Sequence, residues 1–147
     1  MEANNYLLNK IADTKGLTTI SPTWFSIADT DGNISSLASQ AYVTYAHQQG
    51  LEVWGLVDNF KEGVSTYETL SKTSSRQRLV NQLIAAAIQY GLDGINVDFE
   101  LITQDCAQAY IEFIRELSIM CRINGIILSV DNYVPTAFSA QLDRAEQ

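Results

Sequence analysis

The sequence predicts an α/β fold whose parallel strands form part of a barrel. Three observations carry this prediction. Strand-like and helix-like segments alternate along the 147 residues, most of the strands are short apolar runs, and one strand, GLDGINVDFE at residues 91–100, is acidic on one side. Four strands separated by three helices imply parallel pairing with right-handed crossovers. The acidic strand then favours a barrel over an open sheet.

The first predicted elements are a short helix and a bent strand. Residues 4–13 (NNYLLNKIAD) carry apolar side chains at helical spacing. Residues 17–28 are rich in β-branched and aromatic side chains, which favours a strand. Pro22 cannot donate a ladder hydrogen bond, so we expect a bend or a local break at that residue.

A turn and a helix follow this strand. Asp31-Gly32 marks the turn. Ser35 or Ser36 offers its side chain as the N-cap of a helix that runs to about Gln49. Gly50 then supplies the left-handed residue on which such helices end. Together these segments predict one strand followed by one helix.

The second unit repeats this order. Residues 51–58 (LEVWGLVD) form a nearly continuous apolar run, as expected for a strand buried on both faces. A loop over residues 59–73 is expected next. The hydroxyl side chains at 73–75 can cap a helix that extends to Tyr90, and Gly91 provides its stop.

The acidic strand opens the third unit, and a helix and a fourth strand follow it. The helix is predicted to begin at Asp105 and to end at Asn124-Gly125, and residues 126–130 (IILSV) then begin a buried strand. Cys106 and Cys121 fall within this helix about 22 Å apart, which excludes a disulfide between them. We interpret both cysteines as small buried apolar residues.

The acidic strand has two chemically different faces. Asn96, Asp98 and Glu100 recur at a spacing of two and share one face of an extended strand. Ile95, Val97 and Phe99 share the other face. Same-face neighbours lie roughly 6.5 to 7 Å apart, and like charges at that distance favour one carboxyl group keeping its proton.

This polarity discriminates between the two architectures. A doubly wound open sheet fits the chain length better, but helices cover both faces of its central strands and would bury Asn96 and Asp98 under apolar side chains. In a barrel, one face of each strand lines the interior and opens at the carboxyl-terminal mouth. Glu100 stands at such an end, so we predict barrel geometry.

Composition and charge exclude several classes of function. The chain is 46% hydrophobic and 18% charged, as is ordinary for one soluble domain, and its net charge is −8. This negative charge argues against binding nucleic acid or an anionic membrane surface. No apolar run approaches the roughly 18 to 20 residues of a membrane span. An uncharged or polar ligand fits better.

The acidic strand resembles a known family signature. Asp93, Gly94, Asn96, Asp98 and Glu100 are similar in type and spacing to the fourth-strand motif of family 18 glycoside hydrolases, the chitinase-like barrels. Asn96 replaces an aspartate that is common in chitinases, and this form resembles the bacterial branch of spore-germination and cortex-lytic N-acetylglucosaminidases. Residues 21–34 and 47–60 resemble the same branch.

The resemblance implies a role for each matching residue. Glu100 would be the general acid that protonates the leaving glycosidic oxygen. Asp98 would orient the N-acetyl group of the substrate, whose own oxygen is the nucleophile in this family. Asn96 would support Asp98 by a hydrogen bond, and Asp93 with Gly94 would shape the strand entrance. The resemblance implies no metal and no cofactor.

Five residues are candidates for substrate binding: Asp93, Trp54, Asn59, Asp131 and Tyr133. Trp54 fits either core packing or a platform on which a sugar stacks. Asn59 follows the strand at 51–58, whose counterpart in chitinases ends in a serine- and glycine-rich motif that this sequence lacks. Asp131 and Tyr133 follow a strand end and either line the mouth or form an ordinary turn.

The length is short for a whole barrel. A complete barrel needs about 250 residues, so residues 1–147 are expected to form a single, incomplete barrel domain that comprises about strands two to five. An open half-barrel exposes strand edges and an inward face. We therefore expect either self-association, in which two halves complete one another, or dependence on a missing remainder.

Three functions fit these observations. The first is hydrolysis of β-1,4-linked N-acetylglucosamine polymers, such as peptidoglycan, spore cortex or chitin, with retention of configuration. The second is a module that binds such sugars without cleaving them. The third is a non-catalytic scaffold. The first is the leading prediction, and the family resemblance would place the protein in the cell wall, in the spore or outside the cell.

Overall fold

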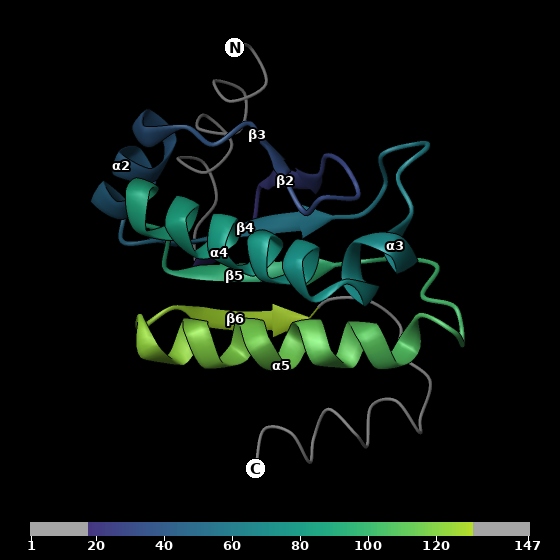
Figure 1. The fold of residues 1–147 in the computed structure, drawn as a ribbon. Coiled ribbons are helices and arrows are strands. Elements are labelled where there is room, and N and C mark those ends of the chain that lie inside the picture. The colour runs from purple at the N-terminus through teal and green to yellow at the C-terminus, as the bar shows by residue number, and fades with distance from the viewer. Residues whose placement is uncertain (1–17, 131–147) are drawn as a thin grey trace.

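The computed structural model describes residues 18–130 as a sheet with helices packed on it (Figure 1). The predicted helix at 4–13 lies outside the described residues. No helix within residues 18–130 has the length and apolarity that a membrane span requires. The strands are β1 (Thr19–Ile20), β2 (Thr23–Ile27), β3 (Ile34–Ser36), β4 (Glu52–Asp58), β5 (Gly94–Asp98) and β6 (Ile127–Val130). The helices are α2 (Gln40–Gln48), α3 (Thr66–Ser71), α4 (Thr73–Tyr90) and α5 (Ala107–Ile123).

The sheet has the strand order β3-β2-β4-β5-β6. β2, β4, β5 and β6 are parallel to one another, whereas β3 at the edge is antiparallel to β2. The parallel strands thus lie side by side in the order in which the chain makes them, with a helix in each crossover. This sequential order is that of a barrel wall, because a doubly wound sheet reverses its order part-way across.

Pro22 interrupts the first strand, as predicted. β1 and β2 lie on either side of it, and both pair in parallel with β4. The Pro22 carbonyl still accepts a hydrogen bond from the Leu56 N–H, at 2.9 Å. The proline lacks only the donor, so the two halves remain in one sheet with a register shift between Thr23 and Phe25.

The prediction that Ser35 or Ser36 caps a helix is wrong. Both residues belong to β3, which pairs with β2 in a hairpin. The hairpin forms because the Asp29 carboxylate accepts hydrogen bonds from the backbone N–H groups of Asp31 and Asn33 and from the Asn33 side chain. The helix α2 begins later, after Ser39, whose hydroxyl accepts the Tyr42 N–H.

The region between β4 and α4 also differs from the prediction. The expected loop at 59–73 contains the short helix α3, whose N-cap Ser65 accepts the Glu68 N–H. The hydroxyl groups at 73–75 do not cap α4. Its N-cap is Lys72, and the buried Ser75 donates its hydroxyl hydrogen to the Thr69 carbonyl. Ser75 therefore ties α4 to α3.

The remaining helix ends are close to the prediction. α4 ends at Gly91, which adopts the left-handed conformation with φ 68°. α5 begins two residues after Asp105, with Cys106 as its N-cap, and ends beside Asn124. Cys106 and Cys121 are both buried and free, so their interpretation as core residues is confirmed.

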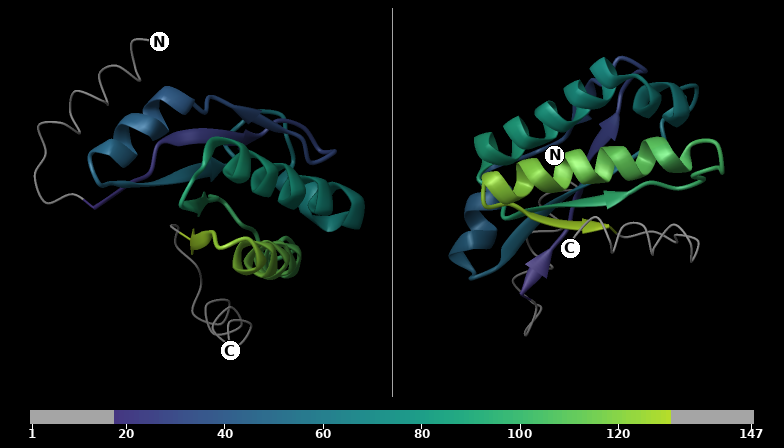
Figure 2. Two further views of the ribbon diagram at one scale, coloured as in Figure 1. Left: turned by 90° about the vertical axis from the view of Figure 1, so that its left-hand side faces the viewer. Right: turned by 60° about the horizontal axis from the view of Figure 1, so that its bottom comes forward.

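The two faces of β5 have the predicted polarity. Phe99, which follows β5, stacks on Phe113 of α5 with ring centroids 5.4 Å apart. Ile95 and Val97 share this face and are fully buried. α4 and α5 lie side by side on the same face of the sheet (Figures 1 and 2). The opposite face carries Asn96 and Asp98, and its neighbours on β4 are the half-buried Trp54 and Leu56 and the buried Asp58.

Candidate active site

The carboxyl ends of β2, β4 and β5 meet at one edge of the sheet. Ser26, Asp58 and Asp98 are Cα partners across these three strands. Neighbouring strands lie about 4.8 Å apart, so three polar side chains stand in a row on one face. Asp58 is 6% exposed, and Asp98 is half-buried. This row forms the floor of the candidate active site.

Asp58 is a candidate for which no role was predicted. Its Oδ1 accepts hydrogen bonds from the Ser26 hydroxyl at 2.7 Å and from the Phe60 N–H at 3.2 Å. A carboxylate with two donors on one oxygen is fixed in orientation. The signal that could have found it is its position, because Asp58 ends an apolar strand as Asp98 does.

Glu100 lies two residues beyond Asp98, just past the end of β5. Phe99 between them is fully buried against α5, so strand alternation turns Glu100 away from the helices. Glu100 is exposed. Leu101 follows with φ 56°, a left-handed conformation that is uncommon for leucine, and it is 93% exposed. The candidate acid thus stands on a sharply turned, accessible segment at the mouth.

Asn59 holds the backbone of Glu100. Its Oδ1 accepts the Glu100 N–H, and its Nδ2 donates to the Glu100 carbonyl, both at 2.9 Å. The same Nδ2 donates to Thr66 Oγ1 at 2.9 Å. The structure therefore brings Asn59 to the mouth beside Glu100, but with its amide already engaged by the protein.

Asn96 lies below Asp98 on the same face. Its Nδ2 donates to the hydroxyl of Ser21 at 3.2 Å. Its Oδ1 is buried and has no hydrogen-bond partner among residues 18–130. Asn96 is therefore a buried amide whose oxygen has no partner among the described residues, two residues before Asp98 on the same face of β5.

Asp93 lies at the amino end of β5, opposite to Glu100. Its Oδ2 accepts the Val53 N–H and contacts His47 Nε2, each at 2.8 Å. Its own N–H and carbonyl join β4 to β6 by bonding Val53 and Ile127. This place fits the predicted role at the strand entrance and takes Asp93 away from the mouth, where it was expected to bind substrate.

Trp54 also lies toward the amino end. It is the register partner of Gly94, four residues before the Asp58 and Asp98 pair, which is about 13 Å along the strand. Its indole N–H donates to Glu52, and its ring covers Gly94, where an added Cβ would lie 2.9 Å from two ring atoms. Trp54 thus packs over Gly94, and the structure does not bring it to the mouth.

Asp131 and Tyr133 lie outside the described residues. The strand that leads to them, β6, is parallel to β5 and ends with Val130 beside Val97. The predicted mouth position of both residues therefore stays a prediction.

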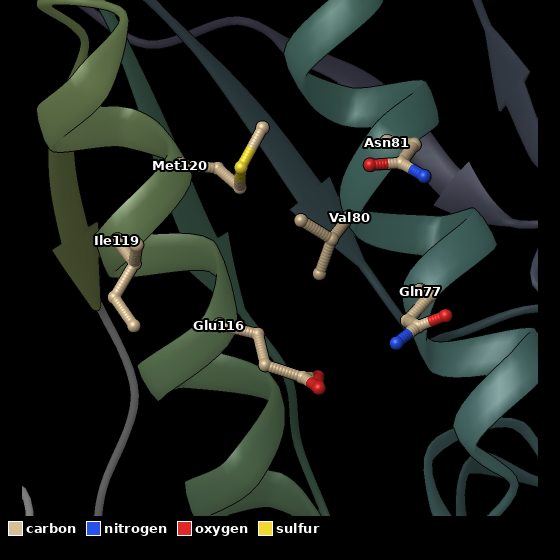
Figure 3. Close-up of a pocket in the computed structure, with 6 residues that line it drawn as sticks. All are labelled: Gln77, Val80, Asn81, Glu116, Ile119 and Met120. Carbon is tan, nitrogen blue, oxygen red and sulfur yellow. The ribbon is translucent and has the colours of Figure 1, made fainter.

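A separate groove lies between α4 and α5, on the helix side of the sheet (Figure 3). It encloses about 290 Å³ and is lined by Gln77, Val80, Asn81, Glu116, Ile119 and Met120. The carboxylates of the mouth belong to the other face, so this groove is distinct from the candidate active site.

Comparisons with known proteins identify the family. Residues 3–141 match the model of the glycosyl hydrolases family 18. The "Uncharacterized glycosylase YvbX" of Bacillus subtilis (strain 168) is 27% identical over 94 residues, which are 60% of this chain and 27% of that protein. The chain therefore spans less than a third of this relative.

Solved structures show the same fold. The spore cortex-lytic enzyme SleL of Bacillus megaterium QM B1551 superposes with a TM-score of 0.74 at 21% identity, over 86% of this chain and 30% of that chain. A chitinase from Chromobacterium violaceum ATCC 12472 gives 0.72 at 21% identity, over 87% and 42%. These likenesses confirm the α/β class and the partial TIM barrel. The chain belongs to the family 18 glycosyl hydrolases.

Proposed function

We propose that this chain carries the acidic half of a glycoside hydrolase site for polymers of β-1,4-linked N-acetylglucosamine. The observation that supports this most is the arrangement of Asp58, Asp98 and Glu100 at the carboxyl ends of adjacent strands. That edge is where barrel enzymes hold their catalytic residues. Residues 1–147 act as one domain in this proposal.

Glu100 is the general acid in the proposed reaction. It protonates the glycosidic oxygen of the leaving sugar while the acetamido oxygen of the substrate attacks the anomeric carbon. The products of this step are the free leaving sugar and a cyclic oxazolinium. Glu100, now a carboxylate, accepts a proton from the water that opens the ring, which gives retention of configuration.

Asp98 orients the acetamido group and stabilises the positive charge that develops on it. Its place next to Glu100 on the same face supports this role. Asp58 adds a second carboxylate at the same level of the sheet, and Ser26 holds it in orientation. Two carboxylates therefore face the region in which a cation forms. Asn96 lies on the same face two residues before Asp98 and, in this proposal, keeps its expected role as support for Asp98.

The names of two relatives support the proposed substrate class. One of them is named as a spore cortex-lytic enzyme and another as a chitinase. We favour an N-acetylated polysaccharide of the bacterial cell wall or spore cortex, because the motif with Asn96 resembles that branch. A protein that acts on such a polymer would work in the cell wall, in the spore or outside the cell.

Replacement of Glu100 by glutamine tests the reaction. Turnover of a chromogenic N-acetylglucosaminide or chitobioside should fall by about 10²- to 10⁴-fold, the usual contribution of a general acid. Sugar binding should stay within about threefold, because glutamine keeps the shape of the side chain. Glu112→Gln is a matched control, since it removes only a surface pair with Arg115 on α5. Unchanged turnover in Glu100→Gln would remove Glu100 from the acid role.

The second candidate function is sugar binding without cleavage. The chain spans less than half of the solved relatives described above, and the similarity to them shows the fold rather than the activity. In that case the unsubstituted chain binds chitooligosaccharides in calorimetry but releases no chromophore. Measurable turnover that Glu100→Gln abolishes would favour the enzyme instead.

A further inference from the structure

We propose that Asn59 is a positioning residue for Glu100, and that Thr66 braces it. The inference rests on the proposed role of Glu100 as the general acid. It replaces the expectation that Asn59 binds substrate. The argument follows from what the Asn59 amide touches and from the backbone that it holds.

The hydrogen-bonding groups of the Asn59 side chain are occupied by the protein. Both hydrogens of Nδ2 have acceptors, the Glu100 carbonyl and Thr66 Oγ1, and Oδ1 accepts the Glu100 N–H. A primary amide has two donors and one acceptor oxygen. Only one lone pair of Oδ1 is left for a ligand, so direct sugar recognition is a minor use of this side chain.

The Asn59 amide extends the β4–β5 ladder beyond its last backbone pair. The register ends with Asp58 beside Asp98. Two residues beyond Asp58, the Phe60 N–H donates to Asp58 Oδ1, so the β4 backbone turns back on itself there and leaves the sheet. The side chain of Asn59 then offers a carbonyl and an N–H to Glu100, as a backbone strand would. Glu100 is held in line with the sheet although β5 has ended.

Glu100 needs such support because of the residue after it. Leu101 has φ 56° and an exposed side chain, so no packing of leucine holds this left-handed conformation. Backbone strain of this kind persists only when the surroundings fix it, and it clusters at functional sites. The bond from Asn59 Nδ2 to the Glu100 carbonyl fixes the peptide group that joins Glu100 to Leu101. Asn59 thereby stabilises the turn that aims the Glu100 side chain.

Thr66 connects α3 to the clamp, by which we mean the hydrogen bonds from the Asn59 amide to the Glu100 backbone. It occupies the first turn of that helix, directly after the N-cap Ser65. Its hydroxyl accepts one Nδ2 hydrogen of Asn59, which fixes the orientation of the amide plane. The clamp thus joins three segments: the end of β4, the start of α3 and the end of β5.

The test compares Asn59→Ala and Thr66→Val with Asn81→Ala, an exposed asparagine on α4, as the control. Steady-state kinetics on the chromogenic substrate and amide hydrogen exchange of Glu100 by NMR are measured for each folded variant. For Asn59→Ala we expect kcat to fall by about 10- to 100-fold with KM within about threefold. The Glu100 amide should exchange about tenfold faster or more. Thr66→Val should show smaller changes in the same direction, and Asn81→Ala none.

Three results for Asn59→Ala would overturn the proposal. A rise in KM at constant kcat would mean that Asn59 contacts substrate. A loss of kcat with unchanged exchange of the Glu100 amide, or no change in either quantity, would mean that Asn59 does not position Glu100. The exchange measurement needs no turnover, so it decides the clamp even if Glu100→Gln disproves the catalytic role. Conversely, a kinetic loss in Glu100→Gln with no effect in Asn59→Ala would leave the proposed function standing without the clamp.

Discussion

Ser26 and Asp58 join the carboxyl ends of β2 and β4 through a hydrogen bond of 2.7 Å from the Ser26 hydroxyl to Asp58 Oδ1. The acceptor carboxylate is buried. Removal of the donor leaves that carboxylate with one partner fewer at the floor of the mouth. The free energy of unfolding therefore depends in part on how well Ser26 satisfies the Asp58 carboxylate, which lies beside Asp98.

Ser26→Ala should lower the free energy of unfolding by about 1 to 3 kcal/mol, the usual range for a hydrogen bond to a buried charged group. Urea denaturation measures this loss. Ser35→Ala is the matched control, because Ser35 is the exposed register partner of Ser26 on β3. Equal losses in the two variants would show that the Ser26 hydroxyl contributes nothing specific.

Asp93→Ala should destabilise the fold by about 1 to 3 kcal/mol, because it leaves the Val53 N–H without its acceptor and removes the contact with His47. It should leave kcat and KM unchanged, since Asp93 lies at the amino end of β5. Asp93→Asn retains an acceptor oxygen and should cost less. A rise in KM for Asp93→Asn in a fully folded protein would return Asp93 to substrate binding.

The buried thiols predict a loss of stability in alkali. Burial raises the pKa of Cys121 from 9.0 to about 11 and also raises that of Cys106. The unfolded chain loses these protons first, so this contribution is fully present below pH 9 and is lost as the pH rises toward 11. For Cys121 the loss is about 1 kcal/mol at pH 10.

Denaturation at pH 8 and pH 10 measures this effect, and Cys121→Ala should flatten the difference between the two. The folded protein should also react slowly with a thiol reagent at pH 8, because both thiols are buried. Rapid labelling of the native protein at pH 8 would contradict this account.

We propose that the 147-residue chain by itself self-associates through the sheet face that carries Ile127, which is one of the two outcomes expected of an open half-barrel, the other being dependence on a missing remainder. Ile127 is 43% exposed there, in register with Gly94 and Trp54. Apolar groups on an open face favour a partner. Size-exclusion chromatography with light scattering at tens of micromolar should show a dimer or larger species, and Ile127→Lys should shift it to monomer. Leu37→Lys, at an exposed site after β3, is the control. A compact monomer of the unsubstituted chain would contradict self-association.

The sequence predicted the elements whose signal is local. α4 and its stop at Gly91 followed from apolar spacing and one glycine, and β5 followed from strict alternation. β3 and α3 were missed because each is short. β3 depends on the Asp29 carboxylate that organises the turn before it, and α3 depends on the Ser65 cap. Aspartate and serine are common in many loops, so Asp29 and Ser65 carry no clear signal until their hydrogen-bond partners are known.

The candidate site was predictable only in part, for the same physical reason. The order of Asn96, Asp98 and Glu100 along one strand was readable from spacing. The contact between Asn59 and Glu100 was not, because Glu100 is 41 residues away and is reached by the Asn59 side chain rather than by the backbone ladder. The aromatic character of Trp54 did not show which end of the sheet it lies near. Only its pairing with Gly94 shows that it lies toward the amino ends of the strands.

The structural contacts of β5 and the candidate site lie at opposite ends of the strand, which has a practical consequence for redesign. The contact between His47 and Asp93 lies at the amino end of β5, and the proposed catalytic residues lie at its carboxyl end. In the proposed site, a library that varies the connections after β4 and β5 should alter sugar preference while Asp93 keeps its contacts at the amino end of β5. The converse library, built around His47, would tune heat resistance and leave selectivity unchanged.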